Sequence, residues 1–166
     1  MPNYCENQIK ISNMTPALKD FLSDERGFLF ERMVQPERPE SDDNEAETLS
    51  AQVAAWGTKW DLSEHDPREV AATLLRCGVA TFQTAWSPPL GAITALSEMF
   101  PDVEISLAYH ELGCGFFGLA DFFDGACDDS CSDTSDTEAY AHFLTSEFGY
   151  GEEDLEEFIW TDTEED

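Results

Sequence analysis

Basic residues are scarce in this sequence. Only 8 of the 166 residues are Lys or Arg, against 36 Asp and Glu, so the formal net charge at pH 7 is -28. The last basic residue is Arg76, and the part of the sequence after it contains 21 acidic residues and no Lys or Arg. Such dense negative charge repels phosphate backbones and anionic lipid headgroups. We therefore expect no direct binding to nucleic acid or membranes, and we expect basic, DNA- or RNA-binding protein surfaces as partners.

Long apolar segments are also absent. No run of about eighteen apolar residues occurs, and the N-terminus lacks an apolar signal segment. The odd number of cysteines has no scaffold-like spacing, which indicates reduced thiols. These are Cys5, Cys77, Cys114, Cys127 and Cys131. The sequence therefore predicts a cytoplasmic protein.

The usual signatures of catalysis are missing too. There is no glycine-rich loop for phosphates, and only His65, His110 and His142 could serve as a base. His110 lies near Cys114 in the sequence, but proximity on a tight turn does not orient a Cys–His pair. We predict a protein that is not an enzyme and that needs no cofactor; a small hydrolase using His110 is a third possibility, after the two binding functions described below.

Metal binding is not predicted either. Cys127 and Cys131, with His110 or His142, offer ligands of the type that zinc prefers, but no second cysteine pair completes a site. The carboxylates of residues 121–138 do not follow the twelve-residue calcium loop, because the glycine and the closing Glu fall at the wrong positions.

What the sequence does contain is an ordered pattern over residues 77–125. Residues 79–86 are β-branched and aromatic and end at a Pro-Pro pair, which predicts a strand. Apolar residues at helical spacing follow over 93–100, and strict alternation over 103–109 predicts a second strand. Residues 116–123 are expected to return as its antiparallel neighbour.

The N-terminal half is less regular. Residues 4–12 alternate like a strand, and Thr15-Pro16 starts a helix as cap and first helical residue. The polar residues 31–47 read as an exposed, mobile insertion, and 46–55 are compatible with a helix. Residues 64–76 fit a helix or a strand equally well.

The C-terminal region changes character. Residues 126–137, rich in Asp, Ser and Thr, are predicted to form a solvated loop. Aromatic residues at helical spacing over 138–148 predict a helix that docks on the core, and 151–160 form a helix with one apolar and one acidic face. The chain thus reads as a core over 1–125 and an acidic loop and helical extension over 126–166, packed on that core.

Four short motifs add a family resemblance. They lie at residues 2–7 (PNYCEN), 56–61 (WGTKWD), 84–89 (TAWSPP) and 109–113 (YHELG). Together they resemble the YubB-type ferredoxin-like domain family of phages and conjugative plasmids, although Tyr4 stands where Trp is usual. The resemblance implies an α+β fold, a βαββαβ sheet with helices on one face, to which the acidic extension is added. It supplies no catalytic residues.

The uncompensated acidic surface suggests a function. Carboxylates about 5 to 6 Å apart on helices imitate the charge of duplex DNA, which carries one charge per roughly 1.7 Å of axis. The leading hypothesis is a phage- or plasmid-encoded DNA mimic that inhibits a host defence complex, a CRISPR effector or a restriction enzyme. The predicted partner-binding residues are Asp128, Asp129, Asp133, Asp136, Glu138, Glu152, Glu153, Asp154, Glu156 and Glu157.

The acidity is also compatible with two different roles. The chain could be a structural or regulatory binding module of a mobile element, whose sheet edge or aromatic patch contacts a partner while the acids serve solubility. Alternatively, the acidity is an adaptation to high salt. The sequence names no target and leaves open whether the chain forms a homodimer.

Overall fold

The structure is a computed structural model, and it describes residues 3–37, 44–62 and 65–160. Five antiparallel strands form one sheet in the order β2-β1-β3-β4-β5. The strands are β1 (Tyr4–Ser12), β2 (Val79–Ala85), β3 (Glu104–Glu111), β4 (Phe116–Phe123) and β5 (Ala126–Asp133). The helices are α1 (Pro16–Leu22), α2 (Glu45–Trp56), α3 (Pro67–Cys77), α4 (Leu90–Met99), α5 (Thr137–Phe148) and α6 (Glu152–Leu155), with a 3₁₀ turn η1 (Phe30–Arg32) and a π-helical turn η2 (Glu156–Trp160).

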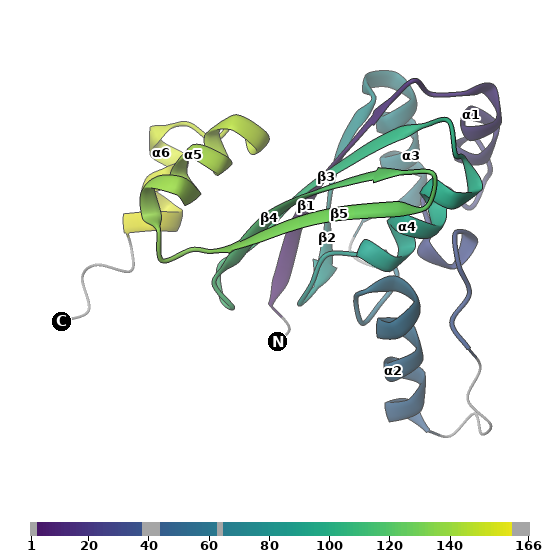
Figure 1. The fold of residues 1–166 in the computed structure, drawn as a ribbon, viewed down its shortest axis with the longest axis horizontal. Helices are drawn as coiled ribbons and strands as arrows, with labels where there is room; N and C mark the ends of the chain where they lie inside the picture. The colour runs from purple at the N-terminus through teal and green to yellow at the C-terminus, as the bar shows by residue number, and fades with distance from the viewer. Residues whose placement is uncertain (1–2, 38–43, 63–64, 161–166) are drawn as a thin grey trace.

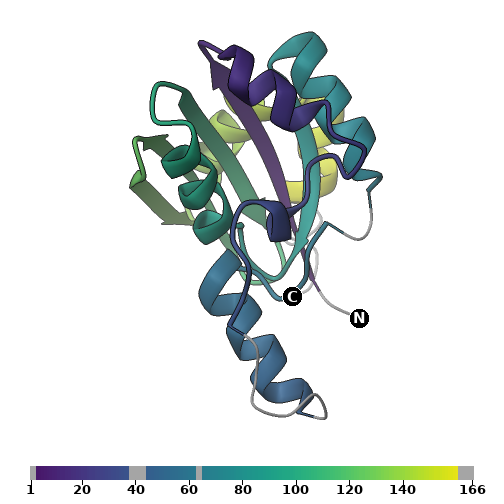
Figure 2. The same cartoon turned by 90° about the vertical axis from the view of Figure 1, so that its right-hand side faces the viewer.

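The α+β, ferredoxin-like architecture expected from the sequence is confirmed. Helices α1, α3 and α4 pack against one face of the sheet, which we call the core face (Figure 2). Strand β1 lies between β2 and β3, and α4 crosses it to connect them. The strand, helix, strand, strand pattern predicted for residues 77–125 is found at β2, α4, β3 and β4.

The sheet has a second face, and α5 covers part of it. Residues alternate between faces along a strand, so Phe116 contacts the main core while Phe117 points the other way. Phe117 forms a second, smaller hydrophobic cluster with Tyr140 and Leu144 of α5. Helices α5 and α6 are therefore packed on the sheet, on the face opposite to α1, α3 and α4 (Figures 1 and 2).

The prediction of a loop over residues 126–137 is wrong. Residues 126–133 form the edge strand β5, paired with β4 from Phe123↔Ala126 to Phe116↔Asp133. Its side chains are all exposed, so no apolar alternation marks it in the sequence. The signal that was available is Asp124-Gly125, since both residues have positive φ (49° and 78°) and Asp-Gly is a favoured two-residue hairpin turn.

Two further segments are settled by the structure. Residues 67–77 are helical (α3), with Asp66 as N-cap and Pro67 at the first position. The predicted exposed insertion at 31–47 begins with buried side chains, because Met33 joins the core and the side chain of Arg32 is only 6% exposed. Arg32 donates hydrogen bonds to the carbonyls of Phe21 (2.8 Å) and Gly27 (2.6 Å). Residues 38–43 of that insertion lie outside the described residues.

Candidate partner-binding surfaces

Helix α5 is anchored to the second sheet face by aromatic rings and polar contacts. The ring of Phe117 lies 5.2 Å from that of Tyr140 and 4.9 Å from that of Phe143, measured between centroids. At the other end of the helix, the Gln8 amide donates to the Glu147 carbonyl (2.6 Å). These contacts fix where the C-terminal acidic residues are displayed.

A buried histidine lies at the centre of this interface. His110 is 1% exposed, its Nδ1 lies 2.9 Å from the Tyr140 hydroxyl, and its ring packs edge-on against Phe148. Burial lowers the pKa of His110 to about 4, and the neighbouring Glu111 carboxylate offsets only part of this effect. The imidazole is therefore neutral near pH 7. Burial also raises the pKa of the Tyr140 hydroxyl, which keeps both partners uncharged.

The terminal segment α6–η2 folds back on the same cluster. Gly149 ends α5 with φ of 70°, and Asp154 caps α6 by accepting a hydrogen bond from the Gly151 amide (2.8 Å). Leu155 and Ile159 pack on the second cluster, as the apolar face of the predicted helix requires. The acidic side chains of the segment are all exposed: Glu152, Glu153, Asp154, Glu156 and Glu157.

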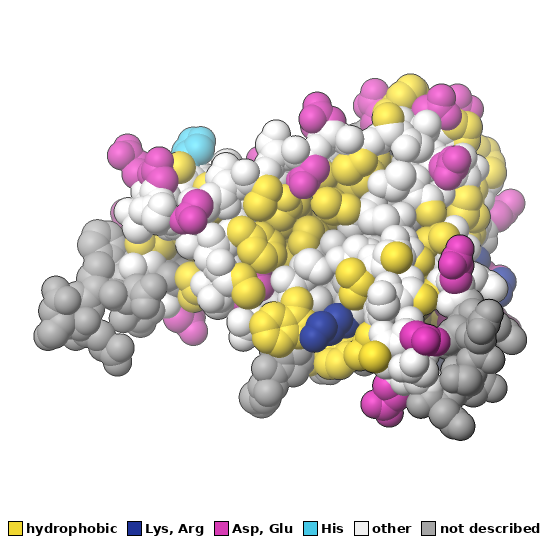
Figure 3. Space-filling view, turned by 60° about the horizontal axis from the view of Figure 1, so that its bottom comes forward, with side chains coloured by type: hydrophobic (Ala, Val, Ile, Leu, Met, Phe, Trp, Pro, Cys, Tyr) yellow, Lys and Arg dark blue, Asp and Glu magenta, His cyan; other side chains and the backbone are white. Residues whose placement is uncertain are grey.

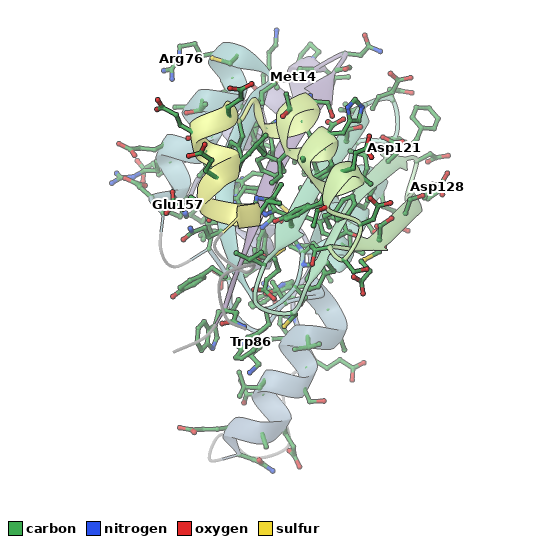
Figure 4. The ribbon with its side chains drawn as sticks, turned by 90° about the vertical axis from the view of Figure 1, so that its left-hand side faces the viewer. Met14, Arg76, Trp86, Asp121, Asp128 and Glu157 are labelled. Atoms are coloured by element: carbon green, nitrogen blue, oxygen red, sulfur yellow. The ribbon has the colours of Figure 1, made fainter. Side chains whose placement is uncertain are left out.

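The ten predicted partner-binding residues do not form one array. Glu138, Glu152 and Glu156 line a single groove between α5 and α6–η2. On β5, by contrast, the side chain of Asp128 belongs to the second sheet face, whereas those of Asp129 and Asp133 belong to the core face. In Figure 4, Asp128 lies on the strands at one side of α5, and Glu157 lies at the other.

Besides Asp154, three of the predicted residues accept structural hydrogen bonds. Asp136 is the N-cap of α5 and accepts from the Ala139 amide (3.0 Å), while Asp133 accepts from the Ser135 amide (2.6 Å), which lowers its pKa. Asp129 accepts from the Tyr109 hydroxyl (2.6 Å) and so fixes a core residue. Burial and this carboxylate raise the pKa of Tyr109.

The Tyr109–Asp129 contact depends on a glycine. Tyr109 of β3 reaches across β4 to β5, and Gly118 of β4 lies under its ring. A Cβ atom at Gly118 would come within 2.3 Å of the Tyr109 hydroxyl and 2.7 Å of the Ser130 carbonyl. Neither atom has room to give way, since the ring is buried and the carbonyl belongs to the paired strand.

Counter-charges are scarce around the C-terminal carboxylates. Among the described residues, Lys10 pairs with Glu147 of α5 at 3.7 Å, and the other ion pairs found there join residues between 24 and 68. In Figure 3, acidic side chains and a histidine lie on the C-terminal helices, and the basic side chains visible on this face lie elsewhere. The exposed carboxylates of Glu138, Glu152, Glu153 and Glu156 are thus available to an external cation.

A second acidic hollow, missed by sequence reasoning, lies on the open part of the second sheet face. It has a volume of about 560 Å³, and its lining includes the carboxylates of Glu104, Asp121 and Asp128 and the side chain of Lys10. Asp121 and Asp128 are directly paired across β4 and β5 (Figure 4). Period-two alternation over the two predicted strands already puts Asp121 on the face of Ser106 and Glu104, and Asp128 would have joined them had β5 been recognised as a strand.

The residues considered for metal binding or catalysis do not form a site. Within residues 3–37, 44–62 and 65–160, no group of three or more His, Cys, Asp or Glu side chains is arranged to hold a metal ion. The Glu111 carboxylate raises the pKa of the Cys114 thiol, which opposes thiolate formation. His110 contacts Tyr140 and Phe148 instead. Among the described helices, none is long and apolar enough to cross a membrane.

The four sequence motifs converge at one end of the sheet. The Trp86 amide donates to the Asn3 carbonyl (2.9 Å), and the Ser87 hydroxyl donates to the Gly57 carbonyl (2.5 Å). Asn3 also contacts Gly113, where a Cβ atom would come within 2.4 Å of its amide nitrogen. Positions far apart in the sequence therefore build one structural corner.

This corner presents aromatic side chains to solvent. Trp60 is 40% exposed and Trp86 is 36% exposed, and the Lys59 ammonium lies 4.9 Å from the centre of the Trp86 ring. Trp86 has φ of 71°, which is rare for a bulky residue and typical of strained functional positions. We call Lys59, Trp60 and Trp86 the tryptophan corner; Trp86 is labelled in Figure 4.

Comparison with known proteins agrees with this fold. Residues 55–160 match the family described as "Ferredoxin-like domain in Api92-like protein", a match that spans well over half of the chain. The chain belongs to this family. Its matched part runs from the end of α2 through η2, so it includes the C-terminal helices as well as most of the sheet. No curated protein and no solved structure is detectably similar to the chain.

Proposed function

We propose that this Api92-like domain is a non-enzymatic inhibitor that acts as a DNA mimic. Its C-terminal helices would occupy the basic, nucleic-acid-binding surface of a host protein and exclude the nucleic acid. The supporting observation is the folded display of the exposed carboxylates of Glu138, Glu152, Glu153 and Glu156 on α5, α6 and η2, in a part of the sequence that contains no basic residue. Anchoring by Phe117, Tyr140 and His110 holds these groups in place before binding, which reduces the entropy lost on association.

The nature of the target is the finer part of this proposal. The YubB-like motifs suggest an origin in a phage or conjugative plasmid, and mobile elements gain from blocking host systems that recognise DNA. We therefore propose a CRISPR effector or a restriction enzyme in the host cytoplasm as the target. Long-range attraction between opposite charges would accelerate the encounter, and carboxylate–Arg pairs would slow dissociation.

The test is competition between this protein and duplex DNA for a captured host protein. Four exposed residues of the terminal segment, Glu152, Glu153, Glu156 and Glu157, are replaced by Gln. The cap residue Asp154 is retained, so that α6 keeps its N-terminal hydrogen bond. We expect the wild type to displace DNA from its target and the variant to fail while keeping its circular dichroism spectrum.

A matched variant controls for the loss of charge itself. It replaces four exposed acids of the N-terminal half, Asp20, Glu25, Glu45 and Glu47, by Asn or Gln. This control should displace DNA as the wild type does. Mimicry by the terminal segment is wrong if its neutralised variant still displaces DNA at physiological salt.

The tryptophan corner supports a second candidate function, a structural or regulatory binding module. Exposed Trp side chains are frequent interaction hot spots, and the backbone at Trp86 is strained to present one. Salt discriminates the two functions, because screening weakens exposed ionic contacts and leaves apolar docking nearly unchanged. Binding that survives high salt but not Trp86→Ala would favour the module.

A further inference from the structure

The groove between α5 and α6–η2 is not purely acidic. It encloses about 520 Å³, and its lining combines the apolar side chains of Ala141, Leu155 and Ile159 with the carboxylates of Glu138, Glu152 and Glu156. Leu155 and Ile159 are half-buried, because they also contact the aromatic cluster under α5. We call this feature the α5–α6 groove.

A rigid DNA-binding channel would satisfy only part of this lining. Lys and Arg side chains can pair with the three carboxylates, but the apolar lining would stay in contact with water or with charged groups. Covering it with an apolar side chain releases that water and adds binding energy that salt does not screen. The lining therefore fits a ligand that has both kinds of side chain close together.

A basic amphipathic helix has this arrangement. Residues three or four positions apart lie about 5 to 6 Å from one another on a helix surface. A Leu or Phe can therefore be flanked by Lys or Arg one turn before and one turn after it. Helix-in-groove binding of this kind is a recurrent mode of recognition.

We propose that the α5–α6 groove binds a basic amphipathic helix of the partner protein. An apolar side chain of that helix enters between Ala141, Leu155 and Ile159, while adjacent Lys or Arg side chains pair with Glu138, Glu152 and Glu156. The inference rests on the proposed function in one respect, since both assign the partner to the acidic C-terminal surface. It adds that the recognised element is a helix with an apolar anchor.

The experiment uses the full chain and two synthetic helical peptides as probes. One peptide has Leu on one face and Lys on the other; the second has the same number of Lys with every Leu replaced by Ala. Affinities are measured by fluorescence anisotropy at low and at physiological salt. We expect the Leu/Lys peptide to bind about tenfold or more tightly than the Ala/Lys peptide, because a buried Leu contributes roughly one tenfold step.

A groove-filling variant separates the groove from the charges. Ala141→Trp places an indole between Leu155 and Ile159 and leaves all acidic residues intact. It should weaken the Leu/Lys peptide about tenfold, to the level of the Ala/Lys peptide. Ser146→Trp, at an exposed position on the side of α5 opposite to its groove residues, should bind like the wild type. Should Ala141→Trp misfold, Glu138→Gln combined with Glu156→Gln tests the acidic rim of the groove. This double variant should bind the Leu/Lys peptide severalfold more weakly than the wild type at low salt, and the difference between the two proteins should disappear at high salt.

The outcomes also separate this inference from DNA mimicry. Equal affinity for the two peptides, or unchanged Leu/Lys binding by a folded Ala141→Trp variant, overturns the groove as a helix site. If the peptide occupies the groove but duplex DNA does not compete with the captured partner, the helix site stands and mimicry fails. If DNA competes but the groove-filling variant inhibits normally, mimicry stands and the helix site fails.

Discussion

Protonation of His110 should loosen the C-terminal extension in mild acid. The imidazole is buried between the sheet and α5, with Tyr140, Phe148 and Tyr150 around it and Glu111 as its neighbour in the chain. Its pKa in the folded protein is lowered from 6.5 to about 4. The unfolded chain therefore binds a proton between these two values and the folded protein does not.

The sign and the size of the effect follow from that difference. Stability increases with pH wherever the unfolded state binds more protons than the folded state. The contribution of His110 to the free energy of unfolding is therefore complete above the unfolded pKa of 6.5, and it is lost as the pH falls towards 4. Each pKa unit corresponds to about 1.4 kcal/mol, so the full loss is about 3 kcal/mol. Between about pH 7 and pH 5 the loss is about 2 kcal/mol.

The assay is urea denaturation at a series of pH values, followed by circular dichroism and tryptophan fluorescence. His110→Gln removes the titrating group and keeps a polar side chain near the Tyr140 hydroxyl. We expect the free energy of unfolding of the wild type to fall by about 2 kcal/mol more than that of His110→Gln over this range. Comparing the two proteins cancels the titration of the many carboxylates, which both share.

His142→Gln is the matched control, because His142 lies on the same helix with an exposed side chain. It should follow the wild type. The argument is refuted if the wild type and His110→Gln lose equal stability between pH 7 and pH 5. Amide hydrogen exchange provides a second measurement, since protons of α5 should lose protection first if the extension opens locally.

Three further substitutions test the packing arguments. Gly118→Ala should destabilise the fold by about 2 kcal/mol, because the added Cβ atom overlaps the Tyr109 hydroxyl and the Ser130 carbonyl. Gly151→Ala, whose Cβ atom has its nearest contact at 3.7 Å, is the control, and equal urea midpoints for the two variants would contradict the clash. Asp61→Ala should cost about 2 kcal/mol in thermal or urea unfolding, because its carboxylate accepts from the amides of Phe30, Glu31 and Leu62; a loss no larger than that of the exposed Asp20→Ala would speak against this role. Trp86→Gly should be about 1 kcal/mol more stable than Trp86→Ala, since glycine adopts φ of 71° without strain, and the reverse order would show that the backbone there is relaxed.

Much of the fold could be predicted from local patterns. The Pro-Pro pair after β2, the alternation over β3 and the Thr15-Pro16 start of α1 each depend on neighbours in the sequence, and the structure contains all three elements. The candidate site was predictable in part. The apolar positions Leu155 and Ile159 correctly placed the acidic face of the terminal segment outwards.

The errors arose where pairing between distant residues decides the structure. Strand β5 is held by backbone hydrogen bonds to β4, and its exposed Asp, Ser and Cys side chains carry no trace of them. For the same reason no local pattern indicates that the Asp129 carboxylate, a predicted partner-binding group, accepts a hydrogen bond from the Tyr109 hydroxyl. The residues of the tryptophan corner were visible only as parts of two separate motifs, 56–61 and 84–89.

The sequence by itself determined the charge, its concentration beyond Arg76 and the periodicity of most helices and strands, because composition and periodicity are local properties. The tertiary structure alone decided that α5 lies on the second sheet face and that Glu138, Glu152 and Glu156 surround one apolar groove. It also decided which carboxylates hold the fold together and which remain exposed. These outcomes depend on strand register and packing across the sheet, which join residues that no local pattern connects.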